Sequence, residues 1–302
     1  MKELSASLSG IVTVYKEEGM TSQTVVNKVK RIFGVAKAGH TGTLDPLATG
    51  VLPVLIGRAV KASEYMLTSD KHYLATLKLG ITTDTEDVTG TVLTECRDIP
   101  SEEQVRQTIS RFVGQIMQTP PMYSALKVGG RKLCDIARGG ETIEREARPI
   151  TVFSIDVNKL SIDEYTLEVR CSKGTYIRTL CADIGSALGC GGVMKTLCRL
   201  SAAGIGLDRA KTLSELAEMT DEQREEFLLK PEFIFRDLRS VTLSPFFSRL
   251  ALSGLEIYLK KIGFEAEEGE RVALFNENGF FALGEVRAFE GGLAIKPIKQ
   301  LG

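Results

Sequence analysis

The feature that most constrains the fold is the run GHTGTLDPLATGVLPVLIG at residues 39–57, where a glycine- and threonine-rich loop leads into an apolar strand at Val51–Ile56. Pro46 disfavours the helical region for the residue before it, so Asp45 is expected to be extended ahead of that strand. The glycines of this run permit close approaches between backbone segments that side chains would block. Because leucines flank Asp45, its carboxylate is costly there unless a cation pairs with it.

Two interpretations of Asp45 remain open from this run: an acid that caps a turn, or a functional carboxylate. Arg178 favours the second, because it falls in the first turn of a predicted helix, where the helix dipole disfavours a cation. A local rule broken in this way often marks a functional site. Asp45 is a candidate partner, held by Arg178 as an ionised and oriented nucleophile. The alternative for Arg178 is a surface arginine with a solvated head.

The length of 302 residues suits two domains, or one large domain with an appendage. No window approaches the ~18 to 20 apolar residues of a membrane span. The N-terminus lacks an apolar core followed by a cleavage site, so a cytoplasmic location without membrane contact is expected. The six cysteines form no CxxC pair, and the histidines lie far apart, so no metal site is expected.

The net charge of −1 conceals an uneven distribution. Residues 170–211 hold seven Lys or Arg against two acids, whereas residues 215–232 hold seven acids against two bases. This pattern is compatible with a basic face for a polyanion and an acidic helix elsewhere, or merely with solvated faces.

Helices are expected at 21–33, with Ser22 as N-cap, and at 101–113, with a capping box formed by Ser101 and Gln104. From about residue 243 onward, short strands joined by Asn-Gly and Gly-Gly turns predict a separate small β domain.

Residues 121–149 carry two Gly-Gly breaks and predict a mobile basic excursion from the core rather than part of the sheet. The basic side chains of this excursion are Lys127, Arg131, Lys132 and Arg138.

Tyr73 begins a predicted strand that ends at Leu79. It is either an aromatic packed in the sheet or a flat ring that lines a pocket for a base. Asp84, Glu86 and Asp87 follow in an apparent turn, and we interpret them as turn residues rather than a metal or acid–base cluster.

Five motifs together resemble the bacterial TruB family of tRNA pseudouridine synthases, from about residue 10 to residue 211: GHTGTLDPLATGVLPVLIG, KHYLATLKLG, YSALK, REARPI and CSKGTYIRTL. The C-terminal portion resembles the family's PUA-like RNA-binding domain in length and hairpin pattern only. The sequence departs from the family at Glu17, where a proline usually follows the lysine matched by Lys16.

The resemblance implies a cofactor-free isomerase that converts uridine 55 in the T-loop of tRNA into pseudouridine, with the tRNA T-arm as partner and a monomer as the expected state. The implied fold is α+β, a mixed central sheet flanked by helices. A catalytic domain at 1–240 would include a thumb at 121–149 that closes on RNA, and a PUA-like domain would occupy 241–302.

The resemblance also assigns roles. Asp45 matches the nucleophile, Tyr73 the ring on the target base and Arg178 the paired cation. The remaining expected substrate-binding residues are His40, which fills the gap left by the extruded base, Lys16 in a supporting loop, Tyr176 and Leu197 around the uridine, and the four basic thumb residues. Attack at ring C6 and participation at the sugar C1′ are both open to the aspartate.

Two other classes of protein remain as alternatives. A non-catalytic tRNA-binding or tRNA-folding protein on the same scaffold would need no buried acid, so the set Asp45, Tyr73 and Arg178 argues against it. A hydrolase with an Asp nucleophile would usually need a metal or a catalytic histidine–acid pair, and neither is evident in the sequence.

Overall fold

The computed structural model describes residues 8–124 and 126–301, without the side chains of Lys127 and Lys132. In this part of the chain a mixed nine-stranded sheet has the order β1-β3-β12-β4-β11-β10-β7, with β2 paired to β3 and β13 to β12. Its strands are Gly10–Lys16 (β1), Ala38–His40 (β2), Thr49–Ile56 (β3), Lys71–Leu79 (β4), Gly114–Gln118 (β7), Arg148–Lys159 (β10), Glu164–Cys171 (β11), Gly192–Ala202 (β12) and Ile205–Gly206 (β13).

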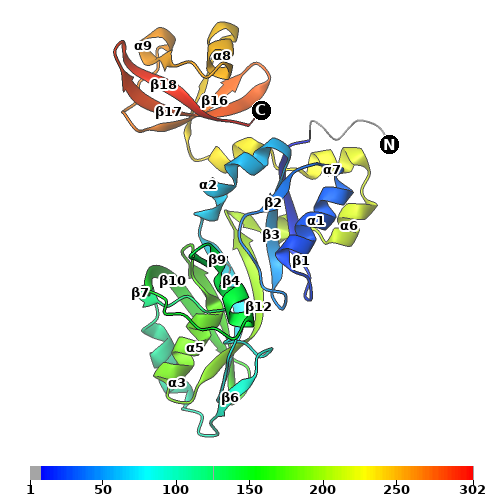
Figure 1. The fold of residues 1–302 in the computed structure, drawn as a ribbon, viewed down its shortest axis with the longest axis vertical. Helices are drawn as coiled ribbons and strands as arrows, with labels where there is room; N and C mark the ends of the chain where they lie inside the picture. Colours follow the sequence, from blue (N-terminus) through cyan, green and yellow to red (C-terminus); the bar gives the residue numbers. More distant parts are fainter. Residues whose placement is uncertain (1–7, 125, 302) are drawn as a thin grey trace.

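The strand β12 is central in the sheet although it comes late in the sequence. It lies parallel to β3 at Cys198 and Arg199 and antiparallel to β4 along its length. One parallel pairing among antiparallel ones makes the sheet mixed, as the family resemblance implied. Figure 1 shows β3, β12 and β4 side by side between the flanking helices.

The two predicted helices form as α1 (Ser22–Ile32) and α3 (Glu102–Ser110). The capping box of Ser101 and Gln104 is confirmed, whereas the N-cap of α1 is Thr21 and not Ser22. Further helical segments that surround the large sheet are Gly57–Ala62 (η2), Ser63–Leu67 (α2), Ile177–Ala187 (α5), Leu207–Arg209 (η3), Leu213–Glu218 (α6), Asp221–Phe227 (α7) and Pro231–Phe235 (η4).

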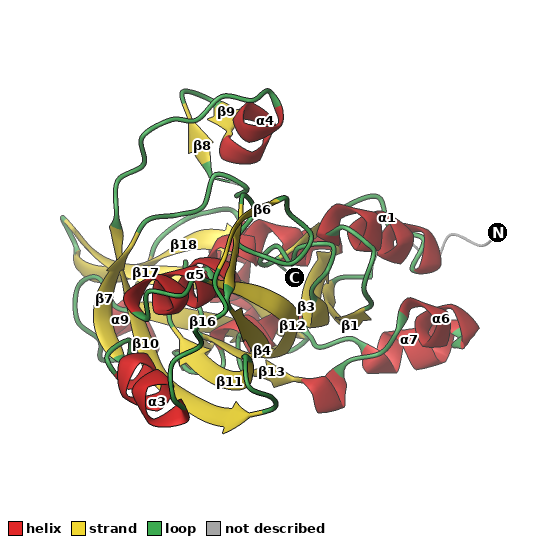
Figure 2. Ribbon diagram, turned by 90° about the horizontal axis from the view of Figure 1, so that it is seen from below, coloured by secondary structure: helices red, strands yellow, loops and turns green. Residues whose placement is uncertain are grey.

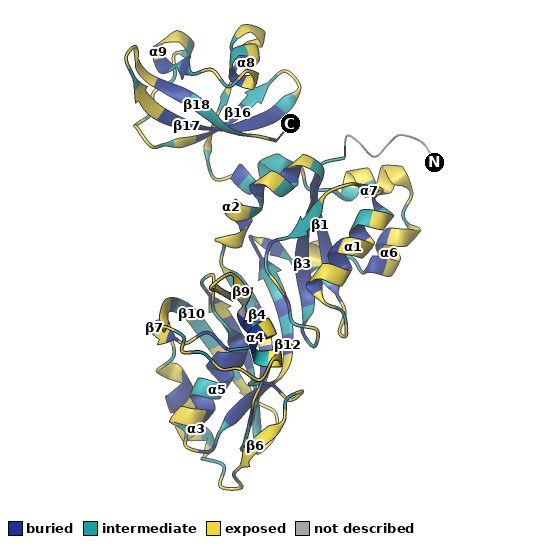
Figure 3. Ribbon diagram, viewed as in Figure 1, coloured by how far each residue is buried: buried dark blue, intermediate teal, exposed yellow. Residues whose placement is uncertain are grey.

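The main core lies between the sheet and its helices. One almost completely buried cluster contains valines of β1 and α1, the apolar face of α5, and Leu52 of β3, Leu77 and Leu79 of β4 and Leu167 of β11. Figure 3 shows the same distribution, with β1 and β3 buried and the outer faces of α6 and α7 exposed. A two-stranded sheet of Ile81–Thr83 (β5) and Val92–Glu95 (β6) extends from the end of β4.

The segment predicted as a basic excursion does leave the sheet, as Figure 2 shows. It forms a hairpin of Lys127–Val128 (β8) and Arg131–Lys132 (β9), followed by Leu133–Arg138 (α4). Its predicted end is wrong by two residues, because Arg148 and Pro149 already pair with β7 as the start of β10. We call 121–147 the thumb.

A second sheet of five strands occupies one end of the molecule (Figure 1). Its order is β14-β16-β17-β18-β15, and it has its own apolar cluster. A further cluster, which includes Phe235 and Phe280, joins it to the rest. Its elements are Arg239–Thr242 (β14), Pro245–Leu252 (α8), Ile257–Tyr258 (β15), Leu259–Ile262 (α9), Arg271–Asn276 (β16), Gly279–Phe289 (β17) and Gly292–Gln300 (β18).

Candidate active site

The loop that carries Asp45 is fixed by a tight turn and by the start of α1. The Ala48 N–H donates to the Asp45 carbonyl over 3.0 Å, with Pro46 at the second turn position that proline favours. The Ser22 hydroxyl donates to the Leu44 carbonyl over 2.9 Å and accepts from the Leu44 N–H over 2.8 Å. Ser22 is free to do this because the neighbouring Thr21 caps the helix, so both polar groups of the residue before Asp45 are bound.

Lys16 stabilises the same turn through hydrogen bonds from its ammonium group. It is completely buried, and its ammonium donates to the carbonyls of Glu17, Pro46 and Ala48 over 3.0, 3.1 and 2.5 Å. Burial lowers the pKa of Lys16 to about 8, although the nearby Asp45 carboxylate opposes this shift. Lys16 does not line the cavity described below, and Glu17, the departure from the family pattern, contributes only a carbonyl to this network.

Arg178 pairs with Asp45, as the sequence led us to expect. It lies in the first turn of α5 and is 5% exposed, and its Nε lies 3.0 Å from the Asp45 Oδ2. Its remaining donors reach two other segments: Nη1 donates to the Thr85 carbonyl over 3.0 Å, and Nη2 donates to the Tyr123 carbonyl over 2.7 Å. One guanidinium therefore joins the Asp45 loop, the β5–β6 turn and the base of the thumb.

Asp87 is the partner that the sequence did not reveal. We interpreted it as a turn residue, and its Oδ1 does accept from Thr85 Oγ1 and from Thr89 N–H and Oγ1 over 2.8, 3.0 and 2.6 Å. Its Oδ2, however, lies 3.7 Å from Arg178 Nη1, and the residue is 4% exposed. Asp87 differs from an acid in a surface turn only because its turn is buried. The spacing of residues in the sequence does not reveal that burial.

The Asp45–Arg178 pair borders a cavity of about 1010 Å³. Of the residues predicted from the sequence, the cavity brings together Asp45, Arg178, His40, Tyr73, Tyr176, Leu197 and Arg138. Arg131 lies outside its lining, 3.6 Å from Glu141 on the exposed thumb. The side chains of Lys127 and Lys132 lie outside the described residues.

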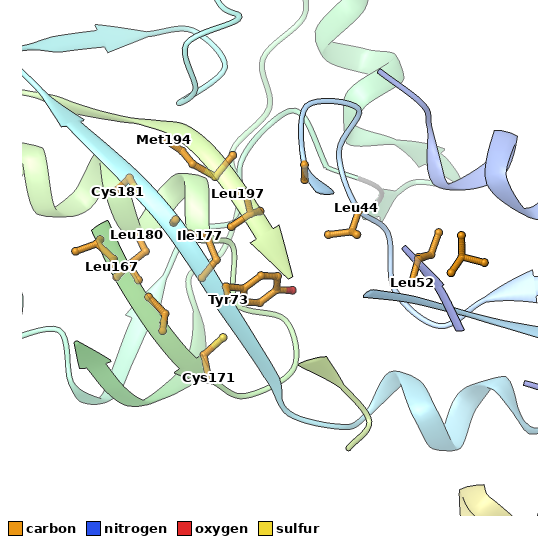
Figure 4. Packing of buried hydrophobic residues seen from close by; sticks show 14 of the residues in the cluster. Leu44, Leu52, Tyr73, Leu167, Cys171, Ile177, Leu180, Cys181, Met194 and Leu197 are labelled. Carbon is orange, nitrogen blue, oxygen red and sulfur yellow. The ribbon is translucent and has the colours of Figure 1, made fainter. Parts of the chain in front are cut away.

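Tyr73 and Leu197 form an apolar side of the cavity. Both are buried, on the adjacent strands β4 and β12, and Figure 4 shows the Tyr73 ring near Ile177 and Leu197 with its hydroxyl directed away from Leu167 and Leu180. A flat aromatic face beside a leucine suits the stacking of a base.

Tyr176 immediately precedes α5. Its N–H donates to Gln118 Oε1 over 2.9 Å, and Gln118 Nε2 donates back to its carbonyl over 3.1 Å. These two bonds fix its position beside Arg178 at the cavity wall.

Arg199 is a third buried cation, after Lys16 and Arg178, and in the sequence it is visible only as part of a basic stretch. It is 1% exposed, and it donates from Nε to the Val51 carbonyl over 2.7 Å and from Nη2 to the Gly42 carbonyl over 3.2 Å. The strand beside it approaches closely at Gly50, whose φ is +99° and whose missing Cβ would lie 2.3 Å from the Arg199 carbonyl. Only glycine fits there.

Burial and nearby charges set the protonation of the site. Burial raises the pKa of Asp45 above its usual range, and Asp87 reinforces this shift while Arg178 and Lys16 oppose it. Burial and the positive charge of Arg199 lower the pKa of His40, so its ring is neutral at pH 7. The Gly42 N–H donates to His40 Nδ1 over 3.4 Å. The site thus offers a carboxylate whose burial outweighs its cationic neighbours, and a neutral imidazole.

Within the described residues, no group of three or more His, Cys, Asp or Glu side chains is arranged to hold a metal ion. In the same part of the chain, no helix combines the length and the apolar character that crossing a bilayer requires.

The similarity of this chain to known proteins covers almost its whole length. Residues 30–177 match the model of the TruB family pseudouridylate synthase N-terminal domain, and residues 178–243 match that of the tRNA pseudouridylate synthase B C-terminal domain. The tRNA pseudouridine synthase B of Alkaliphilus oremlandii is 40% identical over 282 residues, which are 93% of this chain and 94% of that protein. The protein of that name from Francisella philomiragia is 39% identical over 290 residues, 94% and 93% of the two chains.

Solved structures share the fold. A chain of a Cbf5-Nop10-Gar1 complex superposes with a TM-score of 0.74 at 26% identity, covering 97% of this chain and 85% of that chain. A chain of an H/ACA RNP bound to a substrate RNA containing 2′-deoxyuridine gives a TM-score of 0.73 at 23% identity, with 97% and 85% of the chains covered.

Proposed function

This chain belongs to the TruB family of pseudouridylate synthases, and on that premise we propose that it isomerises uridine 55 in the T-loop of tRNA with Asp45 as nucleophile. The relatives that it matches over most of its length are isomerases that act on tRNA, and we assign the same substrate class to it. The observation that carries the proposal is the Asp45 carboxylate held 3.0 Å from Arg178 at the edge of a cavity.

The target uridine must leave its stack before Asp45 can reach it, at a cost of a few kcal/mol. The cavity volume of about 1010 Å³ accommodates an extruded nucleotide. The Tyr73 ring offers a stacking surface to the flipped base, worth ~1–3 kcal/mol, with Leu197 and Tyr176 completing the walls. The neutral His40 is suited to fill the gap that the base leaves behind, because an uncharged ring stacks without the large cost of desolvating a charge.

The reaction rearranges one molecule. The bond between uracil N1 and the sugar C1′ breaks, a bond from C5 to C1′ forms, C5 loses a proton and N1 gains one, so no atom or electron is gained or lost. Asp45 acts as nucleophile and holds one fragment covalently while the ring turns, and this bond breaks again as the product forms, so that the free carboxylate is regenerated. Arg178 keeps the carboxylate oriented in its ionised form and, since its other donors are bonded to Thr85 and Tyr123, it does not swing away.

Substrate binding falls to the basic surfaces around the cavity. Arg138 from the thumb reaches the cavity lining, and Arg131 is exposed on the same segment. We propose that the thumb grips the T-arm and that residues 241–302 form a PUA-like RNA-binding domain beside a catalytic domain of 1–240. A tRNA substrate also favours the cytoplasm as the site of action.

Chemical mapping of pseudouridine in unmodified tRNA tests the reaction and its position together. The wild-type protein is expected to modify position 55, and Asp45→Asn is expected to yield no product while tRNA affinity falls little, because the amide keeps the shape but not the nucleophile. Equal product from both proteins would refute the role of Asp45. Product at another position would refute the T-loop assignment while leaving the reaction intact.

A further inference from the structure

Arg199 lacks the counter-charge that a buried guanidinium needs. It bonds to two backbone carbonyls and to the uncharged Tyr73 hydroxyl, and no carboxylate forms an ion pair with it among the residues that the structure describes. Arg178, by contrast, has two carboxylates within 4 Å. Carbonyls solvate a buried cation only partially, so an anion that enters the cavity beside Arg199 gains from its uncompensated charge.

Lys71 adds a second cation at the same place. It lines the cavity, and its ammonium donates to the carbonyls of Ser69 and Leu67 over 2.5 and 3.4 Å, without an ion pair to any described acid. The side chains of Arg199 and Lys71 converge at Gly42: a Cβ built there would lie 3.5 Å from Arg199 Nη1 and 4.0 Å from Lys71 Cε. Burial lowers the pKa of Lys71, the positive charges of Arg199 and Lys173 lower it further, and Cys171 and Asp70 oppose the shift.

The Thr41 hydroxyl completes this group. Thr41 lines the cavity and is 2% exposed, and its Oγ1 has no hydrogen-bond partner in the described part of the chain. A buried hydroxyl without a partner is costly and is expected to bond to whatever occupies the site. A guanidinium and an ammonium that converge at Gly42, with the unpartnered hydroxyl of the residue before it, form a donor set suited to an oxyanion.

We infer that Arg199, Lys71 and Thr41 form a subsite for one backbone phosphate of the RNA strand, at the linkage beside the flipped uridine. The inference rests on the proposed function, since an RNA strand entering the cavity supplies the anion. The charges of the cavity favour this placement: Asp45 and Asp87 repel a phosphate from the Arg178 side, whereas no described carboxylate pairs with the cations of the Arg199 side. The subsite would therefore set which nucleotide faces Asp45.

The test uses T-arm stem-loop RNAs in which single linkages around the target uridine are neutral methylphosphonates, one linkage per RNA. One RNA of this series is expected to bind the wild-type protein roughly tenfold more weakly than the native RNA does. A loss of this size corresponds to one charged hydrogen-bonded contact. Lys71→Met and Thr41→Val are each expected to weaken binding of the native RNA. With the RNA whose critical linkage is already neutral, the same variants should cause little further loss of affinity, because the contact is absent in both cases. Both variants keep side-chain size, so folding is preserved, and thermal denaturation verifies it.

Lys195→Met is the matched control. Lys195 lies on β12 like Arg199, but it is paired with Glu164 over 2.6 Å and lies outside the cavity. In this variant the neutral linkage should lower the affinity for RNA by the same factor as in wild type. The subsite does not exist if, at every linkage, the fold-loss of affinity from the methylphosphonate multiplies with the fold-loss from Lys71→Met and with that from Thr41→Val, as it would for independent effects. Pseudouridine formation by wild type on the native RNA is measured in parallel, so that a failure of the proposed function is recognised separately.

Discussion

Arg178 and Arg199 are the same residue type at nearly the same burial, 5% and 1% exposed, yet their surroundings differ. Arg178 is balanced by Asp45 and Asp87, and its charge serves within the protein to orient a carboxylate. Arg199 meets backbone carbonyls and the uncharged Tyr73 hydroxyl, and no described carboxylate pairs with it, so its charge is available to an incoming ligand. Burial and residue type alone therefore do not distinguish a cation for chemistry from a cation for binding; the counter-charge does.

The strongest way to break this distinction is Arg178→Met. With the cation gone, Asp45 and Asp87 face each other uncompensated, and Asp45 loses its orientation. We expect the single-turnover rate to fall on the order of 10²- to 10³-fold, the scale of losing one preorganised electrostatic contact. Affinity for tRNA should change much less, because Arg178 is already satisfied inside the protein. Undisturbed turnover would show that the pair has no role in the reaction.

The exposed thumb offers the next largest effect. Removing the charges of Lys127, Arg131, Lys132 and Arg138 together should weaken binding roughly 10²-fold at low salt and reduce the steepness of its salt dependence by up to about 3, since each phosphate contact contributes ~0.7–0.9 to that slope. Binding titrations across a salt series measure both. A slope equal to that of wild type would mean that the thumb makes no phosphate contacts.

Arg199→Met tests the other arginine of this pair, the one proposed to bind RNA. We expect tRNA affinity to fall roughly tenfold and the salt slope to drop by ~1, while the rate at saturating RNA falls far less than in Arg178→Met. Because Arg199 also holds the carbonyls of Val51 and Gly42, thermal denaturation should accompany the binding measurement. A rate loss as large as that of Arg178→Met, in a folded variant, would erase the distinction between the two arginines.

The smallest predicted effect is a shift in pH dependence. Asp45 must be ionised to attack, and burial raises its pKa, so the rate should fall on acidification with a midpoint above the ordinary pKa of an aspartate. Asp87 contributes to this elevation. Asp87→Asn should therefore move the midpoint to lower pH, whatever it does to the maximal rate. Single-turnover rates across a pH series measure the midpoint, and a shift to higher pH would contradict the charge assignment.

The sequence predicted the parts of the site that break a local rule. Arg178 in a helix first turn and Asp45 before a proline are visible because propensity and burial disagree there. Ser22 was assigned to the wrong task, because Thr21 and Ser22 are equivalent as caps and only the packed position of Leu44 separates them. Asp87 and Arg199 were missed for the same physical reason: their significance lies in contacts with segments distant in sequence, which neither periodicity nor capping reports.

The position of β12 has a consequence for biosynthesis. This strand carries Leu197 and Arg199 and inserts between β3 and β4, both made long before it. A chain emerging from the ribosome therefore carries the proposed nucleophile, Asp45, for some time before the strand that joins β3 to β4 is made, so we expect activity only after β12 has been synthesised. Nascent or truncated chains that end before residue 192 are expected to leave the tRNA pool untouched.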